Sequence, residues 1–381
     1  MNFPIDKFEK RQTPFYYYDA QLLDETLESI NSQLRPCDHM HFAVKACTHP
    51  GVLSHIVKAG FGADCVSGGE IQVCLDAGFP AEKIVFAGVG KSDWEIELAL
   101  RAGIFCFNVE SIPELEVINQ LAARQGRVAH VAFRINPNVG AHTHENITTG
   151  RAENKFGIAI EDMVDVVRRS QEMQNVECIG LHFHIGSQLL DMDDFVTLSL
   201  RINELQEVLD SYGISLPNIN VGGGLGIDYI NPDEHPIADF ASYFETFRHY
   251  LCLRPGQQIH YELGRSVVAQ CGSLITRVLY VKEGAVKKFV IVDAGMTELI
   301  RPALYGAHHH IQNLTHTTGS EVYDVVGPIC ESSDVFIKDM RLPECRRGDL
   351  MAIRSAGAYG ETMASRYNCR PLPSGVMSSE T

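Results

Sequence analysis

The sequence predicts an α/β fold of two domains, a (β/α)8 TIM barrel followed by an antiparallel, β-rich, β-barrel-like domain. Eight short apolar runs rich in β-branched residues alternate with amphipathic stretches of helical period. This alternation indicates parallel strands joined by crossover helices, and eight such units favour a closed barrel over an open sheet. Past residue 265, strand-like runs follow one another without long helices, which indicates a separate β domain.

The expected elements of the barrel can be given by residue number. The strands are 41–46, 62–67, 84–88, 104–109, 129–136, 178–186, 218–223 and 258–263. Amphipathic helices are expected at 68–78, 92–102, 112–124, 160–173 and 194–212. In the last of these, Leu198, Ile202, Leu205 and Leu209 fall on one helical face.

The β domain draws on both ends of the chain. Its expected strands are 274–281, 288–293, 321–326, 333–338 and 349–354. The early run 14–18 (PFYYY) is also strand-like and is expected to pair with them, whereas the tail from Pro371 is expected to be frayed. The predicted domains are therefore residues 26–265 for the barrel and residues 1–25 with 266–381 for the β-rich domain.

Composition excludes several classes of partner. The formal charge is -16 and no Lys/Arg-rich run occurs, which argues against binding to nucleic acid or to anionic membrane surfaces. The 11 cysteines are scattered singly, as expected for reduced thiols. The start of the sequence has no apolar leader, and no apolar run approaches the roughly 18 residues of a membrane span. A cytoplasmic protein is expected.

Residues whose side chains or backbone could take part in catalysis or binding fall at the carboxyl ends of the expected strands, where (β/α)8 barrels carry their active sites. They include Lys45, Asp64, Asn108, Glu110, Arg134, His184, Ser187, Gly222–Gly224, Glu262, Gly264 and Arg265.

Lys45 follows the apolar run FAV and is expected to point into the barrel mouth. Partial burial there should lower the pKa of its amine and make it available for Schiff-base chemistry. A lysine that merely extends its ammonium group to solvent at a strand end is the alternative.

The glycine run GGGLG at 222–226 follows the seventh strand. Its backbone N–H groups, free of side chains, suit a phosphate, and the loops after strands seven and eight are the usual phosphate site of such barrels. A tight turn without a ligand would also explain these glycines.

Glu262 precedes the Gly264 turn on the last strand. A carboxylate there would keep a pyridine nitrogen protonated and so strengthen a cofactor ring as an electron sink. An ion pair with Arg265 is the structural alternative.

His182 and His184 share the spacing of zinc ligands, but no further ligand set is evident, so stacking of His184 on a flat cofactor is preferred. In the β domain, the adjacent Cys330 and Glu331 weakly suggest acid/base chemistry, and Tyr359 lies in the turn sequence GAYG.

A set of motifs in fixed order covers residues 12–376. They are FAVKA (42–46), GADCVSGGE (62–70), RINP (134–137), KFGI (155–158), HFHIGSQ (182–188), GGGLG (222–226), ELGRS (262–266), VDAGM (292–296), RPALYGAHH (301–309), GPICESSD (327–334) and GAYGETMASRYNCRP (357–371). Together they resemble the fold-type III decarboxylases that use pyridoxal 5'-phosphate (PLP), and most closely the diaminopimelate decarboxylases.

The resemblance implies a role for each site residue. Lys45 would hold PLP covalently, His184 would stack on the ring and Glu262 would contact the pyridine nitrogen. The cofactor site would also include Asp64, Ser187, Gly223, Gly224, Gly264, Arg265 and Tyr359, several of them around the phosphate. Arg265, Arg301, Tyr305 and Tyr359 would bind substrate. Cys330 would be the proton donor and Glu331 would bind the distal ammonium, both in the partner's site of a homodimer.

The implied reaction is decarboxylation of meso-2,6-diaminopimelate at its D-configured end, giving L-lysine and CO2. The Cys-Glu pair at 330–331 favours this substrate, since ornithine- and arginine-type relatives carry Cys-Asp. Other possibilities are a decarboxylase of ornithine, D-ornithine, D-lysine, arginine or carboxynorspermidine, a PLP-binding protein without catalysis, or a metal-dependent hydrolase using His182 and His184. Leu263, Cys47 and Gly306 depart from the usual residues of the resemblance and leave substrate breadth open.

Overall fold

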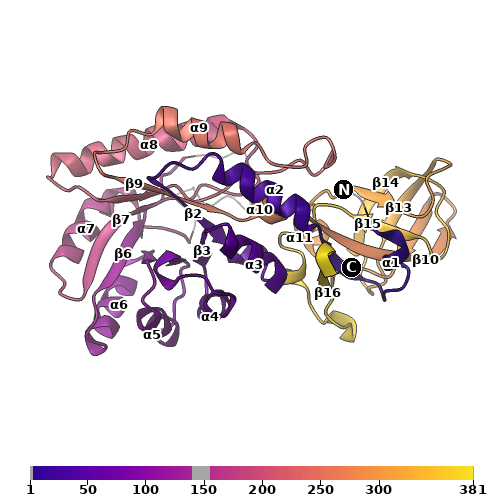
Figure 1. Cartoon of the computed structure of the whole chain (residues 1–381), viewed down its shortest axis with the longest axis horizontal. Coiled ribbons are helices and arrows are strands. Elements are labelled where there is room, and N and C mark those ends of the chain that lie inside the picture. The colour runs from indigo at the N-terminus through magenta and orange to yellow at the C-terminus, as the bar shows by residue number, and fades with distance from the viewer. Residues whose placement is uncertain (1–2, 140–154, 381) are drawn as a thin grey trace.

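The computed structural model describes residues 3–139 and 155–380 and contains the predicted closed barrel of eight parallel strands (Figure 1). The barrel closes where the first strand pairs with the last, with His41 in register with Glu262. Its strands are β2 (Asp38–Ala43), β3 (Gly62–Cys65), β4 (Ile84–Phe86), β5 (Cys106–Val109), β6 (Ala129–Arg134), β7 (Val176–His182), β8 (Asn218–Asn220) and β9 (Gln258–Leu263).

Helices cover the outside of the barrel and bury most of the apolar core between themselves and the strands. They are α2 (Ala20–Asn31), α3 (Pro50–Lys58), α4 (Gly68–Ala77), α5 (Asp93–Ala102), α6 (Ile112–Arg124), α7 (Met163–Gln171), α8 (Met192–Ser211), α9 (Phe240–Tyr250) and the short α10 (Arg265–Val268). The five helices predicted from periodicity are all present, with ends shifted by up to three residues.

Three consecutive helices begin with the same serine–glutamate arrangement, which fixes how each leaves the preceding strand. The pairs are Ser67 with Glu70 at α4, Ser92 with Glu95 at α5, and Ser111 with Glu114 at α6. In α4 the Ser67 hydroxyl accepts from the Glu70 amide, while the Glu70 carboxylate accepts from the Val66 amide. These reciprocal bonds satisfy amides that the first turn of a helix cannot pair.

The second domain is an eight-stranded sheet built from both ends of the chain. Strands β10 (Gly272–Glu283), β11 (Lys288–Val292), β12 (Ile311–Asn313), β13 (Glu321–Val326), β14 (Val335–Leu342) and β15 (Leu350–Ile353) join β1 (Phe15–Tyr18) and β16 (Ser374–Met377). Short helices α1 (Ile5–Phe8) and α11 (Arg301–Tyr305) lie on its connections.

The structure corrects the predicted β domain in three ways. Most strand pairs are antiparallel as predicted, but β11 pairs with β13 and β1 with β16 in parallel, so the sheet is mixed. The tail is not frayed, because β16 pairs with β1 from Phe15 to Tyr18. Strand β12, only three residues long, was missed. The predicted pairing of 14–18 into this domain is confirmed. The limits of the two domains remain a prediction.

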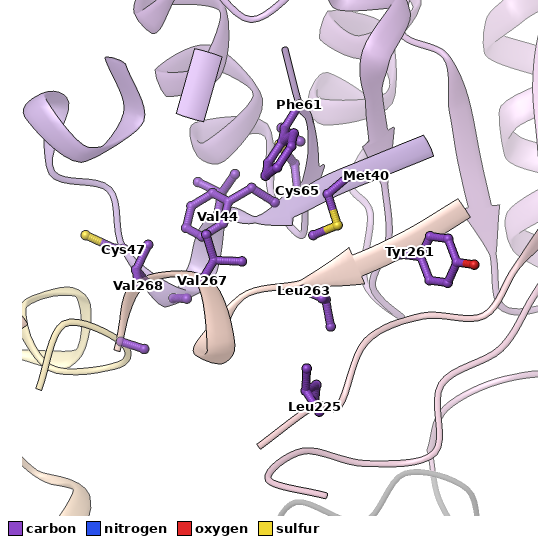
Figure 2. Close-up of a cluster of buried hydrophobic side chains, with 14 of the residues drawn as sticks. Met40, Val44, Cys47, Phe61, Cys65, Leu225, Tyr261, Leu263, Val267 and Val268 are labelled. Carbon is purple, nitrogen blue, oxygen red and sulfur yellow. The ribbon is translucent and has the colours of Figure 1, made fainter. Parts of the chain in front are cut away.

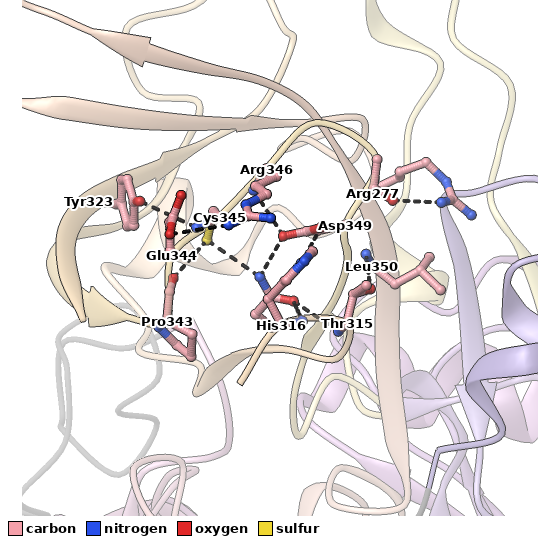
Figure 3. Close-up of polar contacts among 12 residues, drawn as sticks. Arg277, Thr315, His316, Tyr323, Pro343, Glu344, Cys345, Arg346, Asp349 and Leu350 are labelled. Atoms are coloured by element: carbon pink, nitrogen blue, oxygen red, sulfur yellow. Dashed lines mark hydrogen bonds and ion pairs between the residues drawn. The ribbon is translucent and has the colours of Figure 1, made fainter. Parts of the chain in front are cut away.

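One buried carboxylate ties together three loops of the β domain (Figure 3). Asp349 accepts from the side chain of Asn313, contacts Nδ1 of His316 at 2.7 Å, and accepts from the Arg346 amide. Because Asp349 directly precedes β15, these bonds fix the start of that strand. Within the described ranges, no helix is long and apolar enough to cross a membrane.

Candidate active site

A cavity of about 490 Å³ opens at the carboxyl ends of the barrel strands, where the sequence predicted the site. Its walls contain nine of the predicted site residues: Lys45, Asp64, His184, Ser187, Gly224, Glu262, Gly264, Arg265 and Tyr359. Arg134, Phe156 and His182 line it as well. Most of the residues assembled by the resemblance therefore meet in one space.

Lys45 lies beyond β2, in the 3-10 turn Val44–Ala46, and not within the strand as predicted. Its neighbours Val44 and Ala46 are buried, and Val44 packs in the main core near Val267 of α10 (Figure 2). The amide of Tyr359 donates to the Ala46 carbonyl at 2.8 Å. The turn is thus fixed from below by packing and from the side by the β domain, while 44% of the lysine side chain is exposed toward the cavity.

The Lys45 ammonium lies 3.9 Å from the Asp64 carboxylate. The prediction of a lowered lysine pKa is wrong: burial does act to lower the pKa, but Asp64, Tyr359 and Glu262 together raise it above the ordinary value. Burial and the nearby charge of Glu262 raise the pKa of Asp64 to about 8. The charge of Lys45 acts in the opposite sense and lowers the pKa of Asp64.

Glu262 is buried, lines the cavity and has a side-chain partner on each carboxylate oxygen. Its Oε1 accepts from the amides of Asn108 at 3.1 Å and Asn220 at 2.6 Å, and its Oε2 lies 2.8 Å from Nε2 of His182. Burial alone would raise the pKa of this carboxyl, yet His182 and His41 lower it below the ordinary value. The ion pair with Arg265 considered from sequence is not what holds Glu262.

The glycine run after β8 is required by close packing of backbone. A Cβ at Gly223 would lie 2.0 Å from the Glu262 carbonyl oxygen, and one at Gly222 would lie 2.3 Å from that of Phe183. The amides of Gly222 and Gly223 donate within the chain, to Asn220 and to His184 Nδ1. Of these three glycines, Gly224 borders the cavity, so the predicted phosphate nest is narrower than the sequence suggested.

A cationic corner lies opposite Lys45. Arg265 donates to the hydroxyls of Tyr229 at 2.7 Å and Ser187 at 2.9 Å, and its guanidinium stands 4.9 Å from the centre of the Tyr359 ring. Arg265 is 6% exposed, so its charge is held in a fixed position at the cavity wall.

Besides Gly223, four predicted residues do not line this cavity. Arg301 is buried, with Nη1 2.9 Å from His309 Nε2 and its guanidinium over Tyr229, and Tyr305 ends α11 outside the cavity lining. Cys330 and Glu331 are exposed in the β domain, where the Tyr367 hydroxyl donates to Glu331 at 2.5 Å. Within one chain, no role in the cavity is seen for this pair.

Comparison with known proteins decides the family. The sequence model of the pyridoxal-dependent decarboxylases, for their pyridoxal binding domain, matches residues 21–269. The chain is 63% identical over 380 residues to the diaminopimelate decarboxylase of Bacteroides thetaiotaomicron, covering 99% of this chain and 98% of that protein. The chain belongs to the pyridoxal-dependent decarboxylases.

Solved structures support the same family. Diaminopimelate decarboxylase from Helicobacter pylori, complexed with L-lysine, superimposes with a TM-score of 0.93 at 41% identity and covers 98% of this chain and 93% of its own. A lysine/ornithine decarboxylase from Vibrio vulnificus, complexed with putrescine, has a TM-score of 0.82 at 21% identity over 99% of this chain and 98% of its own, which supports the fold alone. The predicted enzyme class, a PLP-dependent carboxy-lyase, is confirmed.

The cavity fits the cofactor of this family. Buried polar atoms without a hydrogen-bond partner among the described residues include Asp64 Oδ1, Arg265 Nε and Ser266 Oγ, as expected where a polar ligand completes a site. The carboxylate of Glu262, the guanidinium of Arg265 and the amine of Lys45 line the same cavity. These features match the pyridine nitrogen, phosphate and aldehyde carbon of PLP.

Sequence reasoning missed the residues that hold Glu262. His182 was weighed as a metal ligand, yet its Nε2 contacts Glu262, and Asn220 was not singled out. Each lies at the end of a short strand whose buried neighbours are apolar, and a buried polar residue in such a strand was the available signal.

The close contact at Gly223 gives a prediction. Gly223→Ala is expected to reduce PLP binding at least tenfold and to lower stability by about 1–3 kcal/mol, because the new methyl group would push the Glu262 backbone away. Absorbance titration with PLP and thermal unfolding measure both effects. In the control, Gly69→Ala, the nearest atom to the added Cβ lies 3.6 Å away on exposed helix α4, so binding should be unchanged. Normal PLP binding by Gly223→Ala would contradict the packing argument.

Proposed function

We propose that this enzyme uses PLP to decarboxylate meso-diaminopimelate to L-lysine and CO2, the last step of lysine biosynthesis. The observation that carries the proposal is the placement of Lys45 and an ionised Glu262 in one cavity, in a chain 63% identical over nearly its whole length to a diaminopimelate decarboxylase. When bound, the cofactor serves as an electron sink for the pair of electrons left when the carboxylate departs.

Different residues of the barrel contact different parts of the cofactor in this proposal. Lys45 would hold PLP covalently, and its amine is the group that the substrate amine would replace. Glu262 keeps the pyridine nitrogen protonated, since its own pKa is lowered and its oxygens are fixed by Asn108, Asn220 and His182. His184 stacks on the ring. Arg265, Ser187, Gly224 and Tyr359 surround the phosphate.

Asp64 is placed to exchange a proton with Lys45. With a pKa near 8 and a distance of 3.9 Å to the ammonium, Asp64 accepts or returns a proton as the lysine amine changes state.

Substrate recognition draws on the β domain. Arg301 and Tyr305, which lie outside the cavity lining in one chain, are proposed to bind substrate carboxylates once the substrate is in place. Cys330 and Glu331 lie outside their own cavity, and we propose that they enter the cavity of a second copy in a homodimer. Cys330 then protonates the carbon that has lost CO2, and Glu331 binds the distal ammonium. The strongly negative net charge of -16 argues against binding to nucleic acid. We propose a cytoplasmic location for the enzyme.

The reaction is tested by measuring CO2 and lysine release from meso-diaminopimelate with added PLP, beside ornithine, arginine, D-ornithine, D-lysine and carboxynorspermidine. Selective formation of lysine supports the proposal. Turnover of another diamino acid alone would keep the PLP chemistry but overturn the proposed substrate. Bound PLP without turnover of any of them would indicate a binding protein.

Lys45→Ala is expected to abolish the visible absorbance of lysine-bound PLP, because no other amine replaces it at the same position. The control is Lys58→Ala, an exposed lysine at the end of α3, which should keep the absorbance. If Lys45→Ala retains the wild-type spectrum, another lysine holds the cofactor.

Cys330→Ala is expected to keep PLP but to lower kcat by roughly 100-fold or more, the usual effect of losing a general acid. Cys369→Ala, another exposed cysteine, is the matched control and should turn over normally. Mixing Lys45→Ala with Cys330→Ala subunits should restore about a quarter of wild-type turnover, because each mixed dimer regains one complete site. Absence of any recovery in verified mixed dimers would contradict shared sites.

A further inference from the structure

Two buried histidines of the barrel interior have no role in the chemistry above. His41 of β2 and His260 of β9 are 3% and 4% exposed, and they lie on the inner side of the barrel toward its amino end. Nε2 of His41 lies 2.9 Å from Nδ1 of His260, with the ring planes inclined by 20°. This is a hydrogen-bond distance, so one of these two nitrogens must donate.

The outer nitrogens of both rings already act as donors. Nδ1 of His41 lies 3.1 Å from the carbonyl oxygen of Lys83, which can only accept. Nε2 of His260 lies 2.9 Å from Oδ1 of Asn218. The amide nitrogen of Asn218 donates to the Ile179 carbonyl at 2.9 Å, so the orientation of this amide is fixed and its oxygen faces the histidine.

Two glycines make room for these outer bonds. A Cβ at Gly62 would lie 2.2 Å from the Lys83 oxygen and 2.6 Å from His41 Nδ1. A Cβ at Gly180 would lie 2.5 Å from the backbone oxygen of Asn218 and 3.0 Å from its Cβ. Any other residue at either position would displace an acceptor, so the arrangement depends on both glycines.

A neutral imidazole carries one N–H. If each ring donates its N–H to its outer acceptor, the lone pairs of the two inner nitrogens face each other at 2.9 Å, which is repulsive. If either ring turns its N–H inward, its outer lone pair faces a carbonyl oxygen instead. A single additional proton between the rings satisfies all three contacts at once.

We propose that His41 and His260 share one bound proton and form a buried monocation beneath Glu262, and that this charge helps to keep the Glu262 carboxylate ionised. The proton is bound by a charge-assisted N–H···N bond, the stronger kind of hydrogen bond. The effect on catalysis rests on the function proposed for Glu262, whereas the shared proton does not.

The surrounding groups oppose protonation of either ring taken by itself and exclude a second proton on the pair. Burial and His39 lower the pKa of both imidazoles, that of His41 to about 4, while Glu262 acts in the opposite sense on both. The three hydrogen-bond contacts, and not these charges, are the basis for the shared proton. A second proton would face a like charge at 2.9 Å. The first proton is held by the inner contact and by Glu262, which is in register with His41 across the β2–β9 pair.

His182 acts on Glu262 by direct contact, since its Nε2 lies 2.8 Å from Oε2, and it lowers the pKa of that carboxyl. The pair at His41 and His260 adds a counter-charge on the amino-end side of Glu262.

The proton is tested by nitrogen NMR of the full-length enzyme labelled with ¹⁵N-histidine, with and without PLP. At about pH 7.5 a free histidine is mostly neutral, since its ordinary pKa is near 6.5. The pair is expected to show one charged ring, or two rings averaged between charged and neutral, and a strongly downfield shared proton. Two neutral rings throughout the range from about pH 6 to pH 8 would overturn the proposal.

The matched variants are His41→Asn and His39→Gln. Asparagine at 41 can still donate to the Lys83 carbonyl but does not reach His260, so the downfield proton should vanish and the folded variant should bind one proton fewer. His39 is exposed and stacks on His260 without entering the pair, so His39→Gln should keep the signal and normal turnover. If His41→Asn does not fold, the wild-type spectrum still decides.

The pH dependence has a definite sign. The proposal gives the histidine pair a pKa in the folded protein that is higher than that of an unfolded histidine. The bound proton then stabilises the folded protein fully below about pH 6.5, and this stabilisation is lost as the pH rises through the pKa of the folded pair. His41→Asn should remove that alkaline loss. It should also raise the pH at which the Glu262 carboxyl group becomes protonated during acid titration, followed by its infrared carboxylate band. An unchanged protonation pH would overturn the effect on Glu262, and lack of turnover by the wild type would count against the proposed function only.

Discussion

A carboxylate buried at the centre of the barrel mouth is the constraint on which the site depends. Glu262 is 7% exposed and would be protonated by burial alone, so it stays ionised only because the strands around it supply donors. Asn108 comes from β5, His182 from β7 and Asn220 from β8. The barrel brings together four strands that are far apart in the sequence to satisfy one side chain.

This constraint changes the interior of the barrel. Barrels of this type are usually filled by branched aliphatic side chains. Here the main apolar core lies between strands and helices, and among the described residues a separate small cluster of Val85, Cys106, Ala132 and Ile179 packs with Phe105. Around that cluster lie the polar residues that hold Glu262 and the histidine pair at its amino end. Close backbone approaches at Gly62, Gly180 and Gly223 make space for them.

The fold was largely predictable because its signals are local and repeated. Eight apolar runs alternating with amphipathic segments predicted the barrel, and the Gly- and Pro-punctuated runs predicted the β domain. Strand β16 was missed because four residues with an exposed start carry almost no periodic signal, and its pairing with β1 joins the two ends of the chain. Pairing between strands so far apart in the sequence cannot be predicted from a local pattern.

The sequence predicted which residues form the site better than it predicted the distances and hydrogen bonds between them. Lys45, Asp64, His184 and Glu262 do meet in one cavity, but the raised pKa of Lys45 depends on its distance to Asp64, which no spacing in the sequence reveals. The glycines after β8 were read as phosphate donors, whereas two of their amides are used within the chain. Cys330 and Glu331 cannot be placed relative to a cavity of the same chain, and their role stays a prediction.

The most direct test of this account is the ionisation state of Glu262 in the full-length enzyme. It can be measured as the infrared carboxylate band in the difference between wild type and Glu262→Gln, from about pH 8 down to about pH 5. The account predicts an ionised carboxylate over the whole range, with and without PLP. A protonated carboxyl band within that range would show that burial prevails over the donors of Asn108, Asn220 and His182, and would contradict the account.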